Sequence, residues 1–246
     1  MSEFGEFLYQ NARPLPVILL LDVSGSMGQN GKIESLKNAV REMLMNFKQG
    51  SNTIVSIQVA IITFGGGGAH ILQSLCDVGK INANCMDNAN ASGGTPFGAA
   101  INLAKQIVED KIQVPSRSYT PTIVAVTDGW PNDNWEQPLN EFIQTGRSAK
   151  CDRMAMGIGS EAQRGPGHEV LQKFISRPEN LFGADDATQI TEFFRFVTMS
   201  TISRTRSTNP NVLADNKTIM DAVKKSATLS KGSAFDFEEE EDDYPF

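Results

Sequence analysis

Residues 17–28 read VILLLDVSGSMG, and this stretch decides the fold. The apolar run ends abruptly at Asp22, and Ser24 and Ser26 follow on alternate positions. Continuous apolar runs of this kind are typical of parallel strands that are buried on both faces of a sheet. Glycines between and after the serines allow a tight turn, so we expect three hard oxygens to converge just beyond the strand. The alternative is a Ser/Gly turn in which Asp22 only caps the following helix.

Apolar segments alternate with helical patterns along most of the chain. Strands are predicted over residues 15–22, 53–64, 69–75, 122–127, 153–158 and 180–182, and helices over 32–47, 97–110, 139–147, 168–175 and 188–202. Strands that alternate with helices imply right-handed parallel crossovers. The pattern therefore predicts an α/β fold with a doubly wound, mostly parallel six-stranded sheet and helices on both of its faces.

Four consecutive glycines at residues 65–68 separate two of these predicted strands. A Gly-rich connection between two apolar runs is typical of a hairpin. A phosphate-binding loop is disfavoured, because no Gly-Lys-Ser/Thr follows the glycines and no helix opens there.

Two further segments place oxygen-bearing side chains at the ends of predicted elements. SGGTP at residues 92–96 precedes a helical pattern, and TIVAVTDG at 122–129 is a second apolar strand that ends in an acid and a glycine. In order, residue type and strand context, these segments and residues 22–26 resemble the metal-ion-dependent adhesion site (MIDAS) of von Willebrand factor A (VWA) domains. The resemblance covers about residues 13–203 and implies a Rossmann-like VWA fold whose hairpin supplies one antiparallel edge strand. The metal-site residues that it implies are Asp22, Ser24, Ser26, Thr95 and Asp128.

These residue types determine which metal and which chemistry to expect. Carboxylates and hydroxyls are hard oxygen ligands, which suit Mg²⁺, or alternatively Mn²⁺ or Ca²⁺, rather than Zn²⁺ or Cu. Mg²⁺ prefers six oxygens and usually keeps several waters, so such a site retains an open coordination position. An Asp or Glu carboxylate from a protein partner is the natural ligand for that position. We therefore expect a divalent-metal-dependent protein-binding module.

An enzyme that uses the same site is the alternative. A Mg²⁺-dependent hydrolase or phosphatase would need a nucleophilic Asp, or an activated water beside a general base. Ser24 stands where a second carboxylate is expected two residues after such an Asp, and His70 and His168 are expected in unrelated loops. We therefore expect no catalytic residues and no enzyme activity.

Composition and charge limit the class of partner and the compartment. Seven of the 29 acidic residues lie in 236–243, and the other 22 acids match 22 basic residues. No broad basic stripe is present, so nucleic acid is not an expected partner. No apolar run reaches about 18 residues, so no membrane span is expected, and the acidic N-terminus does not read as a signal peptide. Three irregularly spaced cysteines fit a reducing cytosol, so a cytoplasmic location is expected.

Residue composition divides the chain into three parts. We expect an N-terminal extension over residues 1–12, one globular domain over 13–206, and a flexible C-terminal tail over 207–246 with an acidic end. Acid-rich segments cannot bury enough surface to fold alone, so a solubilising tail is the simplest interpretation. A sharper hypothesis is that the acidic end enters the metal site of its own chain or of a neighbour. It would then compete with a partner's carboxylate and allow self-association.

Two stretches narrow the resemblance. The loop DGWPND at residues 128–133 and the stretch FFRFVTMSTIS at 193–203 look like those of bacterial TerY-type proteins, which are associated with tellurium-resistance and chemical-stress gene clusters. This resemblance implies a protein kinase and a PP2C-like phosphatase as partners, and a role as a metal-dependent scaffold or phosphorylated adaptor. Hydroxyl residues in 203–208, beside Arg204 and Arg206, are then a candidate phosphorylation stretch, with an ordinary polar linker as the alternative. Trp130 is expected on the rim of the site or packed inward.

Overall fold

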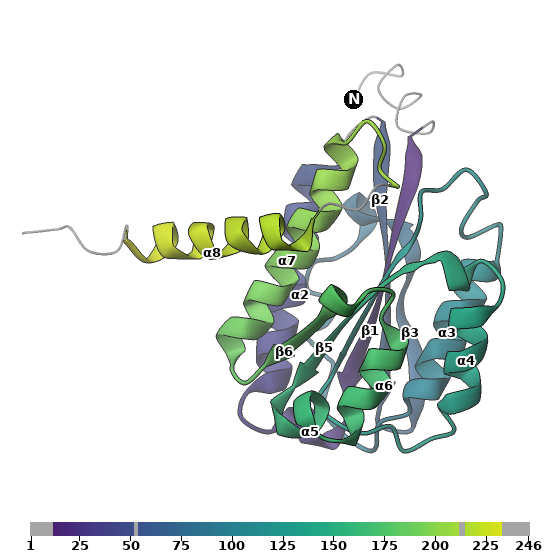
Figure 1. The fold of residues 1–246 in the computed structure, drawn as a ribbon, viewed down its shortest axis with the longest axis vertical. Helices are drawn as coiled ribbons and strands as arrows, with labels where there is room; N and C mark the ends of the chain where they lie inside the picture. Colours follow the sequence, from purple (N-terminus) through teal and green to yellow (C-terminus); the bar gives the residue numbers. More distant parts are fainter. Residues whose placement is uncertain (1–11, 52–53, 212–214, 233–246) are drawn as a thin grey trace, which may run out of the picture.

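A computed structural model of the chain describes residues 12–51, 54–211 and 215–232. Its centre is a six-stranded sheet with helices on both faces (Figure 1). The strands are β1 (Arg13–Val23), β2 (Val55–Gly65), β3 (Gly68–Asp77), β4 (Thr122–Thr127), β5 (Asp152–Ile158) and β6 (Leu181–Ala184). Their spatial order is β3-β2-β1-β4-β5-β6, and every neighbouring pair is parallel except β2 and β3. The predicted doubly wound sheet with one antiparallel edge strand is confirmed.

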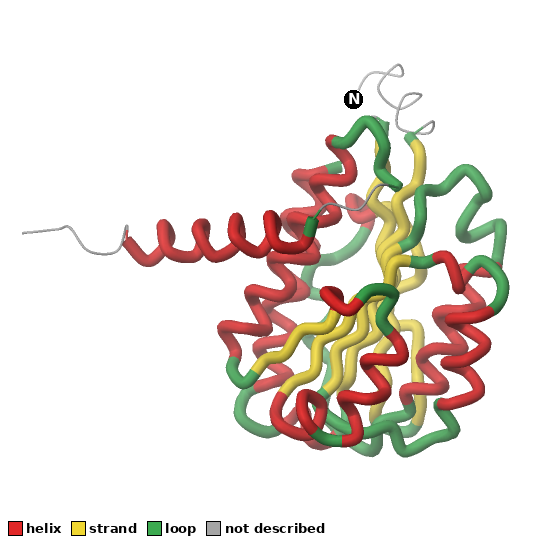
Figure 2. Tube along the Cα trace, in the orientation of Figure 1, coloured by secondary structure: helices red, strands yellow, loops and turns green. Residues whose placement is uncertain are grey.

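Two layers of helices cover the sheet (Figure 2). The helices are α2 (Lys32–Gly50), α3 (Phe97–Glu109), α4 (Glu136–Gln144), α5 (Gly159–Arg164), α6 (Pro166–Phe174), α7 (Ala187–Arg206) and α8 (Asn216–Gly232), with short 3₁₀ turns η1 (Gly25–Gly28), η2 (Val78–Lys80), η3 (Ser148–Lys150) and η4 (Pro178–Asn180). Helices α2 and α7 pack on one face, and α3, α4 and α6 pack on the other. Among the helices that the structure describes, none combines the length and the apolar composition that a membrane span requires.

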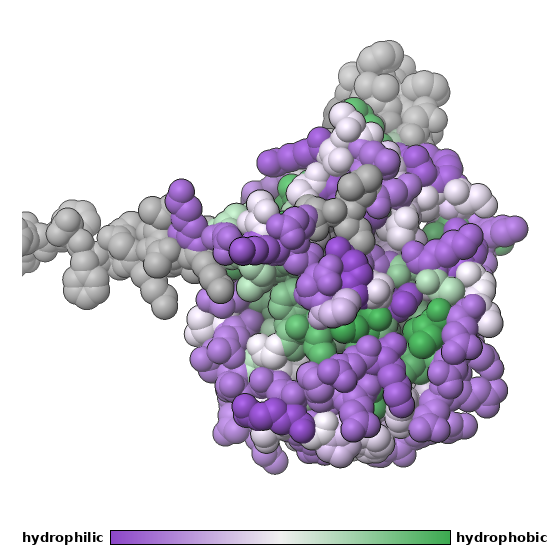
Figure 3. All heavy atoms as spheres, viewed as in Figure 1, coloured by the Kyte–Doolittle hydropathy of each residue, from purple (hydrophilic) through white to green (hydrophobic). Residues whose placement is uncertain are grey.

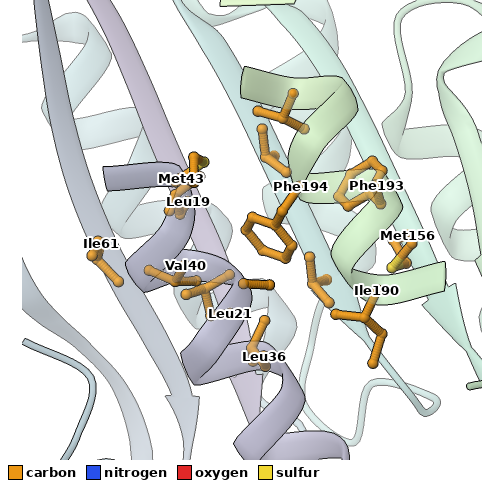
Figure 4. Packing of buried hydrophobic residues seen from close by; sticks show 14 of the residues in the cluster. Leu19, Leu21, Leu36, Val40, Met43, Ile61, Met156, Ile190, Phe193 and Phe194 are labelled. Carbon is orange, nitrogen blue, oxygen red and sulfur yellow. The ribbon is translucent and has the colours of Figure 1, made fainter. Parts of the chain in front are cut away.

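The central strand β1 contributes side chains to both halves of the core. Successive side chains of a strand point to opposite faces of the sheet. Leu19 and Leu21 pack with α2 and α7, near Phe194 in Figure 4. Ile18 and Leu20 belong to the cluster that α3 covers. Because both faces are covered, the strand is apolar at every one of these positions, and its apolar run is broken at Asp22, one residue before the strand ends at Val23.

The outer surface is mainly polar on the face shown in Figure 3, with an apolar area between β6 and α6. A shallow hollow there is lined by Ile175, Pro178 and Leu181, together with polar neighbours. Leu181 is the first residue of β6. This hollow therefore lies toward the amino-terminal ends of the parallel strands. It is separate from the opposite edge of the sheet, where the strands have their carboxyl ends.

Helix α8 lies within the segment that the sequence analysis expected to be a flexible tail. Its residues Ile219 and Val223 are buried against the cluster of α2 and α7. Asn216 Nδ2 donates to Glu179 O at 3.0 Å and to Asn180 Oδ1 at 2.9 Å, which fixes the start of the helix. The helix then extends away from the domain (Figure 1). The acidic end at 233–246 and the extension at 1–11 lie outside the described residues.

Candidate metal site

The candidate site lies at the carboxyl ends of β1 and β4, at the lower edge of the sheet in Figure 1. These strands are parallel neighbours, and Leu21 pairs with Val126. Asp22, near the end of β1, and Asp128, directly after β4, therefore lie at the same edge of the sheet. Ligands of open α/β sheets bind in the crevice outside this edge.

Three loops are joined by backbone hydrogen bonds around the end of β1. Gly25 N donates to Gly93 O at 2.9 Å, and Ser92 N donates to Val23 O at 2.8 Å. Gly93 has a φ of +67°, and a Cβ there would lie 2.9 Å from a backbone nitrogen of the β2–β3 turn. Position 93 therefore requires glycine for both conformation and space. These contacts bring Thr95, in the loop before α3, to the edge that carries Asp22.

The carboxylate of Asp22 is fully buried and is held from two sides. Its Oδ1 accepts a hydrogen bond from Ser24 N at 2.7 Å, and its Oδ2 accepts one from Thr127 Oγ1 at 2.5 Å. Burial raises the pKa of Asp22 to about 6; the hydrogen bonds from Ser24 and Thr127 oppose this rise, and the charge of Asp128 adds to it. The carboxylate is thus oriented, and its negative charge is disfavoured by its surroundings, so a bound cation would be stabilising.

Asp128 is also buried, and both of its carboxylate oxygens have partners. Oδ1 accepts from Ser26 Oγ at 2.6 Å, and Oδ2 forms an ion pair with Lys32 Nζ at 2.6 Å. Ser26 Oγ lies 3.1 Å from Ser24 Oγ. The two serine hydroxyls therefore connect Asp128 to the turn that begins at Asp22.

Thr95 is held in place by the loop that follows β4. Thr95 N donates to Asn132 Oδ1 at 3.0 Å, and Thr95 O accepts from Asn132 N at 3.1 Å. A Cβ on Gly129 would lie 3.8 Å from Thr95 Oγ1, so this hydroxyl faces the residue after Asp128. The five residues implied by the resemblance therefore gather at one edge of the sheet.

The loop over residues 130–135 combines buried and accessible side chains. Trp135 is buried, and its ring meets that of Trp130 edge to face, with 5.7 Å between the centroids. Asp133 accepts from the backbone N–H groups of Gly98 and Ala99 at 3.1 and 2.9 Å, and so caps the first turn of α3. Trp130 remains 39% exposed, so it is an accessible aromatic side chain two residues after Asp128.

The residues present fit a hard divalent cation. Two carboxylates and three hydroxyls form the donor set, with no sulfur and no imidazole among the five. Asp22 carries a buried carboxylate whose pKa is raised further by a second acid, Asp128. A bound divalent cation would offset both the burial of this charge and the repulsion between the two acids.

The two histidines lie on regular elements and not in loops, which corrects the expectation from sequence. His70 lies on β3. His168 lies in α6, which begins at Pro166, and its Nε2 is 2.9 Å from Gln172 Nε2 of the same helix. Neither histidine forms a hydrogen bond with Asp22 or Asp128 in the part of the chain that the structure describes.

Three residues that hold the site were missed by the sequence analysis. Thr127 orients Asp22, Asn132 holds Thr95, and Lys32 pairs with Asp128. Lys32 could have been noticed in the sequence. A basic residue at the start of a helix interacts unfavourably with the helix dipole, so its presence there indicates an acidic partner elsewhere in the fold. Thr127 and Asn132 are ordinary strand-end and loop residues, and only the folded chain shows what they contact.

Comparison with known proteins agrees with this architecture. Residues 17–130 match the family model of the von Willebrand factor type A domain. No curated protein matches the chain significantly in sequence. The pilus adhesin SpaC from Lactobacillus rhamnosus GG superimposes with a TM-score of 0.64 at 15% identity, over 78% of this chain and 31% of that chain.

Two further solved structures have the same fold. A von Willebrand factor type A protein from Catenulispora acidiphila gives a TM-score of 0.60 at 20% identity, over 78% of this chain and 43% of that chain. Proximal thread matrix protein 1 from the mussel byssus, in a structure with a zinc-occupied MIDAS motif, gives a TM-score of 0.60 at 14% identity. The superposition covers 78% of this chain and 48% of that chain. The chain thus spans less than half the length of each of these three proteins. The match over residues 17–130 and the shared architecture identify the fold of this chain as that of a VWA domain.

Proposed function

We propose that the domain binds one divalent metal ion, preferably Mg²⁺, through five oxygen-bearing residues. They are Asp22, Ser24, Ser26, Thr95 and Asp128. The observation that carries this proposal is their convergence at one sheet edge, with two buried carboxylates and serine hydroxyls in mutual contact. An all-oxygen set favours Mg²⁺, with Mn²⁺ or Ca²⁺ as alternatives. The similar mussel protein with zinc in its MIDAS motif supports a divalent ion at this position.

We propose further that the metal serves protein binding and not catalysis. Mg²⁺ usually keeps several waters, so a bound ion would supply a position that a partner's Asp or Glu carboxylate can occupy. Trp130 exposes an apolar surface beside that position. Among the described residues, neither His70 nor His168 forms a hydrogen bond with Asp22 or Asp128, as a general base that is oriented by the site would. These observations support a binding module over the alternative of a Mg²⁺-dependent hydrolase or phosphatase.

The cellular role that we propose is that of a scaffold or adaptor in a bacterial stress-response system of the tellurite-resistance type. Its partners would be a protein kinase and a PP2C-like phosphatase, in the cytoplasm. The resemblance of residues 128–133 and 193–203 to TerY-type proteins supports this role. Phe193 and Phe194 in the second stretch are buried core residues, so their resemblance reflects packing. The loop at 128–133, which lies beside the candidate metal site, is therefore the stretch that bears on function.

A metal titration tests the site. We expect calorimetry to show one Mg²⁺ or Mn²⁺ bound per chain. Asp22→Ala should weaken binding by about 100-fold or more, because it removes a buried charged ligand. Asp221→Ala, on an exposed position of α8, is the control and should bind as the wild type does. Equal affinities for the wild type and Asp22→Ala would contradict the proposed site.

A pull-down from native bacterial lysate tests the role of the metal. The full chain is used with Mg²⁺, with EDTA, and as Asp22→Ala with Mg²⁺. We expect a partner that is retained only by the wild type with Mg²⁺, and mass spectrometry should identify a kinase or a PP2C-like phosphatase. A partner that is retained equally under all three conditions would exclude binding through the metal.

A further inference from the structure

Lys32 provides a positive charge at the mouth of the candidate metal site. Its Nζ lies 2.6 Å from Asp128 Oδ2, and the carboxylate side chain that it contacts is fully buried. The lysine side chain itself is 20% exposed, so the ammonium lies at the mouth of the site and not in the core. One of the two carboxylates thus already has a cationic partner that belongs to the chain.

The position of Lys32 is unfavourable for the helix that it opens. It is the first residue of α2, and the amino-terminal end of a helix carries a partial positive charge that disfavours a cation. The two preceding residues, Asn30 and Gly31, have φ values of 54° and 69°, in the left-handed region. The N-cap residue Gly31 has no side chain that could accept from the first turn. The ion pair with Asp128 therefore offsets an unfavourable position of the lysine at the start of the helix.

The charge of the site depends on this lysine. Asp22 and Asp128 bring two negative charges, and Lys32 neutralises one of them. A divalent ion added to this site leaves a net positive charge, whereas the same ion without the lysine would leave the site neutral. Lys32 thus opposes the metal electrostatically, and a partner's carboxylate would remove the excess charge.

We propose that Lys32 competes with the divalent metal for Asp128 and thereby holds the metal affinity of this domain low until a carboxylate partner arrives. The inference rests on the proposed metal site. It assigns to Lys32 the role of setting metal affinity, and it does not make Lys32 a metal ligand.

The test is a calorimetric titration of the full chain with Mg²⁺ alone and with Mn²⁺ alone. We expect Lys32→Met to bind either ion at least tenfold more tightly than the wild type, because the competing charge is gone. Lys32→Arg keeps the charge and should bind no more tightly than the wild type. Lys37→Met is the matched control: Lys37 lies on the same helix but contacts Glu34 and Asp87 O, so its removal should change metal affinity by less than about threefold.

Thermal unfolding gives a second measurement that does not depend on fitted affinities. In EDTA, Lys32→Met should melt below the wild type, because the buried Asp128 loses its counter-charge. Mg²⁺ should raise the melting temperature of Lys32→Met by more than it raises that of the wild type. If the wild type binds Mg²⁺, Asp22→Ala does not, and Lys32→Met binds no more tightly than the wild type, the role of Lys32 is refuted while the metal site stands. If the wild type, Asp22→Ala and Lys32→Met all fail to bind either ion, the proposed site itself is refuted.

Discussion

The buried carboxylate of Asp22 makes the stability of the metal-free domain depend on pH. Its pKa is raised from 3.8 to about 6, mainly by burial. Between about pH 4 and pH 6 the folded chain therefore holds a proton that the unfolded chain has released, so the free energy of unfolding falls as pH rises through this interval. At neutral pH the ionised carboxylate destabilises the metal-free fold by about 3 kcal/mol.

We predict that Asp22→Asn is more stable than the wild type in EDTA at pH 7, by about 2 to 3 kcal/mol. The amide can accept from Ser24 N and donate to Thr127 Oγ1, so it keeps both contacts without the charge. Urea unfolding at pH 4 and pH 7 checks this, and the difference should nearly vanish at pH 4. A variant that is less stable than the wild type at pH 7 would show that burial does not disfavour the carboxylate.

Arg204 lies in the candidate phosphorylation stretch but has a structural role. Its guanidinium donates at 2.7 Å to Pro210 O, Thr122 Oγ1 and Thr120 O. Burial lowers its pKa to about 10, so it stays charged at neutral pH while it ties the end of α7 to the start of β4. Thr205 is buried as well, whereas Ser207 and Thr208 are exposed. A phosphate on the exposed residues would have to pair with Arg206 and not with Arg204.

Single residues show what the sequence could and could not predict. An acid directly after an apolar run indicates the edge of a sheet, and Asp22 and Asp128 do lie at the same edge, at the ends of neighbouring parallel strands. The resemblance missed Asn132, which holds Thr95 from a loop 37 positions away. Contacts between loops depend on distances that only the folded chain defines, so they cannot be predicted from a local sequence pattern.

Two neighbouring residues in the loop after β4, Asn132 and Asp133, have different structural roles. Asn132 accepts from Thr95 N, and a Cβ at Gly94 would lie 1.8 Å from Asn132 Nδ2, so the amide fits closely against this loop. Asp133 instead accepts from two N–H groups at the start of α3. The first residue positions a candidate metal ligand, and the second stabilises a helix.

We predict that Asn132→Ala weakens Mg²⁺ binding by about tenfold, as is usual when a residue that orients a metal ligand is removed. Asp133→Ala should instead lower the free energy of unfolding by about 1 kcal/mol, through the lost cap, and should leave Mg²⁺ affinity nearly unchanged. Calorimetry and urea unfolding of both variants separate the two roles. Equal losses of affinity in the two variants would mean that the loop acts as one unit.

Helix ends were the least predictable elements. The third predicted helix was expected to begin at residue 139, after Pro138, but α4 begins at Glu136. Proline is tolerated there because the first N–H groups of a helix have no partner within it. Helix α8 was missed for another reason: its apolar positions Ile219 and Val223 become buried only when the helix packs on the folded domain, where it contacts α7.

The architecture of the whole domain was the most predictable property. A strand that is apolar at every position must be covered on both faces, and helices between parallel strands provide that cover. The glycine run at 65–68 predicted the hairpin, and the structure has the antiparallel pair β2–β3 there, with positive φ at Gly66, Gly67 and Gly68. The strands and the hairpin depend on hydrophobic periodicity and on turn residues, which are local properties of the sequence. They can therefore be predicted without knowledge of contacts between distant residues.

The position of α8 bears on the hypothesis that the acidic end enters a metal site. The helix starts beside Asn180, at the amino-terminal end of β6, whereas the candidate site lies at the carboxyl ends of the strands. Its 17 residues carry the chain about 25 Å away from that start. The helix thus directs the chain away from the domain that carries its own site (Figure 1). This direction favours the site of a second copy over the site of the same chain.

We therefore predict that residues 235–246 act between copies. Sedimentation velocity of the full chain at high concentration should show self-association with Mg²⁺ that is absent with EDTA. Deletion of 235–246 should abolish it, and so should Asp22→Ala, which keeps the tail but removes a proposed ligand. The same deletion should strengthen binding of the partner recovered with Mg²⁺, because a competing carboxylate is gone, and should change nothing in EDTA. If full-length and shortened chains bind that partner equally and sediment alike with Mg²⁺, the tail does not occupy the site of either copy.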